Sequence, residues 1–362
     1  MSYSGENKYF SFRDGFCETL SGVTVGSSET ALFGRTIAKF FRRFSIGCDC
    51  FRNMHILYAL CSGISECGHD VYVCENTDLP SFRFGLSMLS ADCGIFISGN
   101  ESLKMSFFGA DGFPVSSAML TRIMKATPAE NSGKCGKIMS CTSFREIYIN
   151  NLADTFSDTG SSIPAGISCG NRSVRSLWLE FFSGEDESLV FQVSDDGQRV
   201  NAYSTEAGFI SHEKLILAYA VKLSATGQAV YLPENFHYSA DILTENSQLE
   251  IKRFPIEKPV PPEVIQQRFL NDPLYMCIHL ARNKPEFIHT VKSLPALASV
   301  RREIFIENPE DVPYGKTIQE TDGRIIITRS GRNHITLLAQ SHNAETASEI
   351  CSDWYEKLKN NS

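Results

Sequence analysis

The chain has 362 residues, of which 42% are hydrophobic and 21% charged, an ordinary globular composition with room for more than one domain. Its net charge of −8 argues against a protein that binds nucleic acid through the phosphate backbone, so we expect no nucleic-acid partner. No apolar run is long enough to span a membrane, and the first residues lack the pattern of a secretory signal. We therefore expect no membrane partner and a cytoplasmic location.

The 12 cysteines are scattered along the chain, and the closest pair is Cys48-x-Cys50. No Cys-x-x-Cys pair is present, and no second close pair completes a zinc site. The pattern favours reduced, buried thiols over disulfides or a metal centre.

The first part of the chain alternates short apolar runs with helical patterns. The runs predict strands at residues 44–49, 70–74 and 94–97, and helices at 32–43, 54–64, 82–89 and after the capping residue Ser116. This alternation predicts a Rossmann-like parallel sheet. In such sheets ligands lie beyond the carboxyl ends of the strands, so the turn at Ser98-Gly99-Asn100 is a candidate site.

Residues 126–136 are small and polar and read as a linker. Beyond it, apolar runs predict strands at residues 165–168, 189–193, 229–232, 249–252, 324–327 and 334–338, the last two forming a hairpin. Helices are predicted at residues 212–223, from Asp272-Pro273 onward, and after Asn343. His279 and His289 lie in helical segments and read as ordinary surface or core histidines.

Several segments, taken in order, resemble the α-D-phosphohexomutase family, which includes phosphoglucomutases and phosphomannomutases. The family reads roughly GI(M/V)ITASHNP followed by a lysine-containing run and (F/Y)GADG, and this chain has Gly94–Ile97 and Phe108–Gly112 in the matching places. Residues 9–15, 44–49, 194–199 and 328–334 resemble four further family motifs. The resemblance covers nearly the whole chain.

Between the two matching pieces, Ser98-Gly99-Asn100-Glu101-Ser102 replaces the family's TASHNP, and the loop is shorter. The resemblance places Asn100 at or near the serine that carries phosphate in the family. Ser98, Asn100 and Ser102 are therefore the candidate catalytic residues of a degenerate phosphoserine loop.

Ser194–Arg199 stands where the family has DGDGDR, a loop that holds magnesium through three alternating carboxylates. The aligned positions are Ser194, Asp196 and Gln198, so only Asp196 keeps a charged ligand. We expect a polar turn here with at most a weak metal ligand in Asp196. No cofactor is expected, except magnesium if the chain is an active enzyme.

Thr328–His334 resembles the family's phosphate-binding RPSGTEP loop, so the resemblance assigns Arg329, Ser330, Gly331, Arg332 and Asn333 to a phosphate site. Two guanidinium groups at a glycine turn suit that role. The family's sugar-reading GEESGH loop has no counterpart, since residues 258–262 are Lys-Pro-Val-Pro-Pro.

The expected fold is α/β, with successive Rossmann-like α/β/α domains, parallel or mixed sheets, and a small C-terminal α+β domain. The expected domains are residues 1–130, a shortened second domain at 137–226, a shortened third at 227–300, and a C-terminal domain at 301–362.

The resemblance implies a phosphohexomutase homologue that is catalytically impaired and binds a phosphorylated sugar, another small anion, or a protein partner, including a second copy of itself. The alternative is an active phosphotransferase on hexose phosphates with an altered phosphoacceptor serine and a weak metal site. A purely structural role as a subunit is a third hypothesis.

Overall fold

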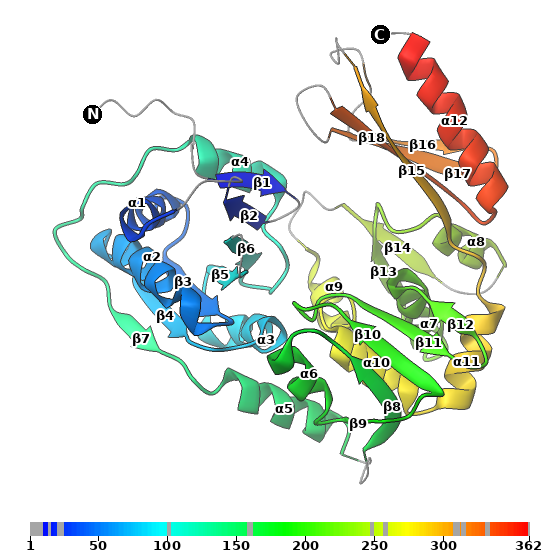
Figure 1. The fold of residues 1–362 in the computed structure, drawn as a ribbon, viewed down its shortest axis with the longest axis horizontal. Helices are drawn as coiled ribbons and strands as arrows, with labels where there is room; N and C mark the ends of the chain where they lie inside the picture. The colour runs from blue at the N-terminus through cyan, green and yellow to red at the C-terminus, as the bar shows by residue number, and fades with distance from the viewer. Residues whose placement is uncertain are drawn as a thin grey trace. The chain divides into compact units, whose positions relative to one another are not determined.

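The computed structural model describes residues 10–13, 16–19, 25–99, 103–157, 162–246, 250–255, 260–306, 312, 316–329 and 334–360. The chain divides into two compact units. The first consists of Met1–Val200 and Glu257–Ile278, and the second of Asn201–Ile256 and His279–Ser362. Each unit has its own strands and helices (Figure 1). Helices and strands are mixed in both units, as the sequence predicted.

The first unit is built around a seven-stranded mixed sheet with the order β1-β2-β6-β5-β3-β4-β7. Its strands are β1 (Phe10–Arg13), β2 (Phe16–Thr19), β3 (Arg43–Cys48), β4 (Asp70–Cys74), β5 (Cys93–Ser98), β6 (Lys104–Gly109) and β7 (Ile138–Ser140). Strands β5, β3, β4 and β7 are parallel neighbours, and β6, β2 and β1 extend the sheet antiparallel. The three strands predicted before residue 100 are confirmed as β3, β4 and β5.

Helices cover both faces of this sheet. They are α1 (Ser27–Ile37), the short 3-10 helix η1 (Phe51–Asn53), α2 (Met54–Glu66), α3 (Leu79–Leu89), α4 (Ser117–Lys125) and α5 (Phe144–Thr155). Successive residues of a strand point to opposite faces. Ile95 and Ile97 of β5 accordingly pack into the core formed with α1, α2 and α4, while Phe96 packs with α3 and α5. The result is a three-layer α/β/α arrangement.

The predicted helix at residues 32–43 is wrong at both ends, because α1 begins at Ser27 and ends at Ile37. The Gly26 N–H donates to Glu29 Oε2 at 3.1 Å, and the Glu29 side chain thereby fixes an earlier helix start. Sequence reasoning placed the start at Leu32, where the apolar residues begin.

α1 and α2 approach each other closely through two glycines. A Cβ added at Gly63 of α2 would lie 1.9 Å from the Ala31 carbonyl oxygen, and one at Gly34 of α1 would lie 2.6 Å from the Leu60 carbonyl oxygen. No side chain fits at either contact, so the spacing of the two helices depends on these glycines.

A second group of strands completes the first unit. The parallel strands are β8 (Ile163–Ser168), β9 (Phe182–Gly184) and β10 (Leu189–Val193), accompanied by α6 (Arg172–Trp178), α9 (Pro262–Gln267) and α10 (Pro273–Ala281). The buried rings of Trp178, Phe182 and Phe191 pack together, with centroids 5.4 to 5.9 Å apart. These aromatic contacts form the centre of this part of the core.

A polar cluster ties the later segment back into the first unit. Asp272 accepts hydrogen bonds from Tyr148 Oη and from Arg268 Nε, both at 2.7 Å, and Arg268 Nη1 donates to Asn151 Oδ1 at 2.7 Å. Burial raises the pKa of Tyr148 well above its ordinary value, so the phenol stays protonated and donates. Residues from α5 are thereby joined to the segment that starts α10.

The second unit combines helices with small sheets. Its elements are β11 (Val200–Ser204), β12 (Gly208–Ile210), α7 (His212–Ser224), β13 (Val230–Pro233), α8 (Ser239–Asn246), β14 (Ile251–Phe254), α11 (Lys284–Ser293), β15 (Ala298–Phe305), β16 (Lys316–Glu320), β17 (Gly323–Arg329), β18 (His334–Ser341) and α12 (Ala344–Asn360). β13 and β14 pair in parallel, and β15-β18-β17-β16 form an antiparallel sheet packed against α12. The predicted pairing of residues 324–327 with 334–338 is confirmed, as is the Asn343 cap, which accepts from Glu345 N at 2.9 Å.

Arg324 of β17 is 2% exposed and links the sheet of the second unit to the loop after β13. Its guanidinium donates to Gln340 Oε1 at 2.8 Å, to the Glu234 carbonyl oxygen at 3.2 Å, and to the Phe236 carbonyl oxygen. Burial lowers the pKa of Arg324 to about 10, which still leaves the group protonated at neutral pH. The Arg324 cation therefore donates hydrogen bonds to the backbone carbonyl oxygens of Glu234 and Phe236.

Within the described residues, every helix is too short or too polar to cross a lipid bilayer.

Candidate ligand-binding pocket

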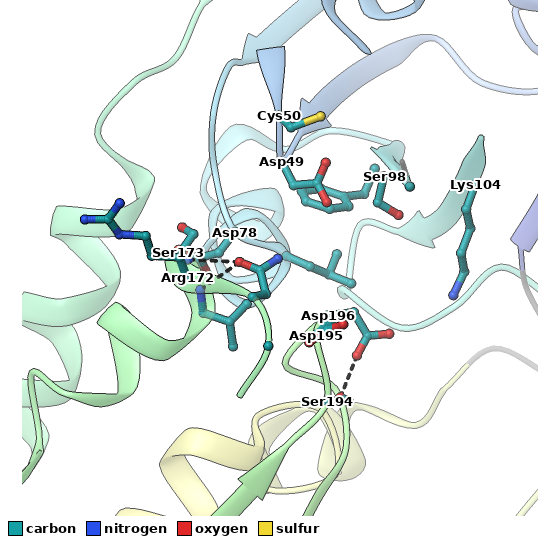
Figure 2. A pocket seen from close by; sticks show the side chains of 16 residues that line it. Asp49, Cys50, Asp78, Ser98, Lys104, Arg172, Ser173, Ser194, Asp195 and Asp196 are labelled. Carbon is teal, nitrogen blue, oxygen red and sulfur yellow. Dashed lines mark hydrogen bonds between the residues drawn. The ribbon is translucent and has the colours of Figure 1, made fainter. Parts of the chain in front are cut away.

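A pocket of about 660 Å³ opens in the first unit where several strands end (Figure 2). Most of its lining comes from the segments that follow β3, β4 and β5 of the large sheet and β8 and β10 of the second group, and the rest comes from β5 and β6 themselves. Each of these five strands pairs in parallel with another of them, and the pocket lies beyond their carboxyl ends. This is the position at which open α/β sheets bind ligands.

One wall is formed by the β5–β6 pair. Ser98 at the end of β5 lies directly opposite Lys104 at the start of β6, and both side chains line the pocket. Asn53 Nδ2 donates to the Gly99 carbonyl oxygen at 3.0 Å and so holds the start of the turn. Gly99 has φ +104°, a backbone conformation that favours glycine.

Asp49 follows β3 and also lines the pocket. Its Oδ1 atom is buried, and no donor among the described residues reaches it. Burial raises the pKa of the Asp49 carboxyl above its ordinary value, because water is removed from the charged form. The pocket wall thus contains a buried carboxylate oxygen that accepts no hydrogen bond from the described residues.

Asp78 is a second lining carboxylate, but it is already neutralised. Its fully buried side chain accepts from Ser81 N at 2.9 Å, which caps α3, and from Arg145 Nη1 at 3.0 Å. Arg145 also donates to the Ser173 carbonyl oxygen and to Ser176 Oγ, both at 3.1 Å. This ion pair fixes α3, α5 and α6 around the pocket.

The segment after β8 forms another part of the lining. Asn171 caps α6 by accepting from Ser173 N at 2.9 Å and Val174 N at 3.3 Å. Figure 2 shows the Arg172 guanidinium directed away from the other labelled side chains. A Cβ at Gly170 would lie 2.6 Å from Asp195 Oδ1, so this segment and the loop after β10 touch closely.

The loop after β10 contains Ser194, Asp195 and Asp196, which line the pocket. Asp196 Oδ1 accepts from Ser194 Oγ at 2.7 Å and from Gln198 N at 3.0 Å, as Figure 2 shows in part. Ser194 N bonds the Arg199 carbonyl oxygen at 2.9 Å, and Gly197 adopts φ +71°. The expected polar turn is confirmed, and Asp196 holds it together.

These residues do not fit the magnesium site that the family resemblance implies. Ser194 and Gln198 supply no carboxylate, and one oxygen of Asp196 is used inside its own loop. In the part of the chain that the structure describes, no three His, Cys, Asp or Glu side chains are placed to hold a metal ion. Magnesium prefers an octahedral set of oxygens with concentrated negative charge, which this loop does not present.

The residues assigned from sequence have different outcomes. Ser98 and Asp196 lie far apart in sequence but line one pocket. Asn100 and Ser102 lie outside the described residues, as do Ser330, Gly331, Arg332 and Asn333, while Arg329 is the last residue of β17. The roles of all these residues stay predictions.

Sequence reasoning did not select Asp49, Asp78, Lys104 or Asn171, although each lines the pocket. Two signals were available. Asp49 is the last residue of a predicted parallel strand, and Asp78 has a proline two residues later, a pattern typical of a helix start. Lys104 required knowledge of the pairing between β5 and β6, because its place opposite Ser98 depends on strand register.

The twelve cysteines are all free. Cys50 lines the pocket, and burial raises the pKa of Cys48, Cys61 and Cys74 to about 12. Protonated, buried thiols of this kind are chemically inert.

No known family model and no curated protein matches the sequence. The fold, however, is similar to that of solved structures. A phosphoglucomutase/phosphomannomutase family protein from Burkholderia thailandensis superposes with a TM-score of 0.70 at 11% identity, covering 99% of this chain and 98% of that one. A protein from Thermus thermophilus assigned as a phosphomannomutase superposes with a TM-score of 0.66 at 13% identity, covering 98% of this chain and 100% of that one. The resemblance predicted from sequence is thus confirmed at the level of structure: the chain has the fold of the phosphoglucomutase/phosphomannomutase family.

Proposed function

We propose that this protein is a catalytically impaired phosphohexomutase homologue, a pseudoenzyme that binds a phosphorylated sugar in the pocket described above. One observation carries the proposal. The segment of Ser98 and the loop of Asp196, which the resemblance assigns to the phosphoserine loop and the metal loop, meet in a single pocket at strand ends. The place for a ligand is therefore retained while the reactive groups differ.

Impairment is supported by the residues that stand at the reactive positions. Asn100 stands at or near the position of the phosphate-carrying serine, and Ser194 and Gln198 replace two carboxylates of the metal loop. Phosphoryl transfer gains most of its rate from positioning and charge neutralisation. The loss of one such electrostatic group commonly slows a reaction by about a hundredfold or more. Two such losses would leave turnover near background, although grouped effects are not strictly additive.

A second candidate function is an active phosphotransferase that uses Ser98. The observation in its favour is that Ser98 Oγ and the Lys104 side chain line the same pocket from directly opposed strand positions. In that reaction the Ser98 oxygen would attack phosphorus as the bond from phosphorus to the sugar oxygen breaks, and the proton lost by the Ser98 hydroxyl would be balanced by one gained by the departing sugar oxygen. Serine beside a glycine turn is more commonly ordinary turn chemistry, so we place this function second.

The test combines binding with turnover. Glucose 6-phosphate, mannose 6-phosphate and glucosamine 6-phosphate are titrated by calorimetry, and the corresponding 1-phosphates are assayed for conversion with magnesium and a bisphosphate activator. We expect binding of at least one sugar phosphate and turnover indistinguishable from the background. The absence of binding to all of them contradicts the proposal.

Ser98→Ala separates the two functions. Appreciable turnover by the wild-type protein that disappears in Ser98→Ala but persists in Ser87→Ala supports the active phosphotransferase. Ser87 lies on the exposed side of α3, where its hydroxyl donates to the Phe84 carbonyl oxygen at 3.1 Å, and it does not line the pocket.

A further inference from the structure

We propose that Cys74 and Cys141 are a redox modification site, and that oxidation joins their sulfur atoms in a reversible disulfide. The bond ties the end of β4 to the residue that follows β7, the edge strand of the seven-stranded sheet. The inference goes beyond the proposed function, because it concerns the frame of the first unit and holds for whatever ligand the pocket takes.

The two cysteines stand side by side because β4 and β7 pair in parallel. The register places Val73 opposite Ser140, and the Cys141 N–H donates to the Val73 carbonyl oxygen at 2.7 Å. This hydrogen bond keeps the two strands in register up to Cys141, so the next opposed pair is Cys74 and Cys141. Neighbouring strands lie about 4.8 Å apart, within the span of about 4.4 to 6.8 Å between the Cα atoms of disulfide-bonded cysteines.

Both side chains lie on one face of the sheet. Val71 and Val73 of β4 belong to the core formed with α1, α2 and α4, whereas Cys74 packs in the opposite core, which contains Phe82 of α3. Cys141 packs against that same opposite core. Burial raises the pKa of the Cys74 thiol to about 12, and the nearby Cys141 thiol adds to the rise. The two thiols are therefore neighbours in space as well as in register.

An ion pair holds the segments that follow the two cysteines. Asp78 comes four residues after Cys74, Arg145 comes four residues after Cys141, and the Asp78–Arg145 distance is 3.0 Å. Strand pairing before the cysteines and the ion pair after them keep these two segments at a constant separation. Holding two reacting groups close together in this way speeds a reaction between them.

The two thiols differ in exposure, and this difference sets the order of events. Cys74 is 1% exposed, whereas Cys141 is partly exposed. A buried, protonated thiol is inert toward reagents in solution, so an oxidant reaches Cys141 first. With hydrogen peroxide, the Cys141 thiolate attacks one oxygen and the O–O bond breaks, which leaves a sulfenic acid on Cys141 and hydroxide that takes up a proton as water.

The second step takes place within the protein. The Cys74 sulfur attacks the Cys141 sulfur, the S–O bond breaks, and the Cys74 proton leaves with the hydroxide as a second water. Ser45 Oγ lies 3.6 Å from Cys74 Sγ and can donate to the sulfur as its proton leaves. Two thiols are thus oxidised while one peroxide is reduced to two waters, and a dithiol reductant reverses the reaction.

The experiment treats the reduced full-length protein with hydrogen peroxide at about pH 8, where thiols begin to ionise. The remaining thiols are alkylated after unfolding, and the protein is digested with trypsin and an endoprotease that cleaves before aspartate. Residues 70–77 and 138–145 are then separate peptides with one cysteine each. We expect the main cross-linked species in the mass spectrum to join these two peptides and to disappear after dithiothreitol treatment.

A second readout is the melting temperature. The oxidised protein should melt about 3 °C or more above the reduced protein, because a disulfide that closes a long loop restricts the unfolded chain. Cys141→Ser should abolish both the cross-linked species and this rise. The matched control is Cys135→Ser, which removes a more exposed thiol from the segment before β7 and should change neither. Melting curves of the reduced variants establish that each is folded.

Three results would overturn the inference. The main cross-link could join other cysteines, or Cys141 could be oxidised to a sulfinic acid while Cys74 stays free to be alkylated after unfolding. The oxidised protein could also melt at or below the temperature of the reduced protein, which would show that the fold does not accommodate the bond. None of these results concerns sugar phosphate binding, so the proposed function is tested separately.

Discussion

Asp49 places a carboxylate in the pocket wall at a cost in stability. One oxygen is buried without a hydrogen-bond donor among the described residues, and burial raises the pKa of the group. The folded protein therefore holds this proton more tightly than the unfolded chain does. Asp49 accordingly lowers stability as the pH rises from the unfolded carboxyl pKa of about 4 through the folded value.

We predict that Asp49→Asn raises the free energy of unfolding at pH 7 by about 1 kcal/mol, the lower end of the cost of a buried unsatisfied group. The gain should shrink as the pH falls toward 4, because the wild-type carboxyl then becomes neutral as well. Urea unfolding at the two pH values measures both quantities. Asp154→Asn, at an exposed position of α5, should change stability by less than about 0.5 kcal/mol. A variant less stable than wild type at pH 7 would contradict the prediction.

At the scale of elements, the crossing of α1 and α2 depends on the absence of side chains. In an exposed helix, replacing glycine by alanine stabilises by about 1 kcal/mol. Here the added Cβ at Gly63 meets a backbone oxygen of the other helix at 1.9 Å, which cannot move without displacing α1. We predict that Gly63→Ala instead destabilises the protein by about 1 to 3 kcal/mol, the typical cost of overpacking.

Thermal and urea unfolding check the sign of this effect. The neighbouring substitution Ser62→Ala, at an exposed position of the same helix, is the control and should be neutral or slightly stabilising. If Gly63→Ala is as stable as Ser62→Ala, the two helices are not held at the spacing described here.

The sequence predicted the secondary-structure elements better than it predicted the pocket. The strands β3, β4 and β5 were predicted because short apolar runs bounded by polar residues are a local signal. The start of α1 was missed because Glu29 acts on it from within the helix, three residues after Gly26.

The pocket itself could be predicted only in part. Ser98 and Asp196 followed from the motif resemblance, whereas the Arg145–Asp78 ion pair and the position of Lys104 depend on pairings between distant segments.

At the scale of the whole molecule, the chain divides into two compact units, and the second contains its own buried ion. Arg324→Met removes the donor to the Glu234 carbonyl oxygen and one donor to the Phe236 carbonyl oxygen. We predict a loss of about 2 kcal/mol, because buried acceptors left without partners cost about 1 to 3 kcal/mol each and Arg253 still donates to Phe236.

Hydrogen exchange measured by mass spectrometry localises the effect. Protection should fall in β13, β17 and β18 of the second unit and stay unchanged in β3, β4 and β5 of the first. Arg301→Met on β15, where the side chain is 64% exposed and pairs with Glu303, should alter protection little. An equal loss in both units would show that they unfold as one cooperative body.

The β5–β6 pair has a consequence for engineering. Its register rather than the connecting loop fixes where Ser98 and Lys104 stand, and that register continues to Cys93 and Gly109. The residues that connect Ser98 to Lys104 can therefore be replaced while β5 and β6 keep their pairing. A library of longer inserts at this point, with the phosphohexomutase TASHNP sequence among them, would introduce new reactive side chains while the rest of the pocket lining stays unchanged.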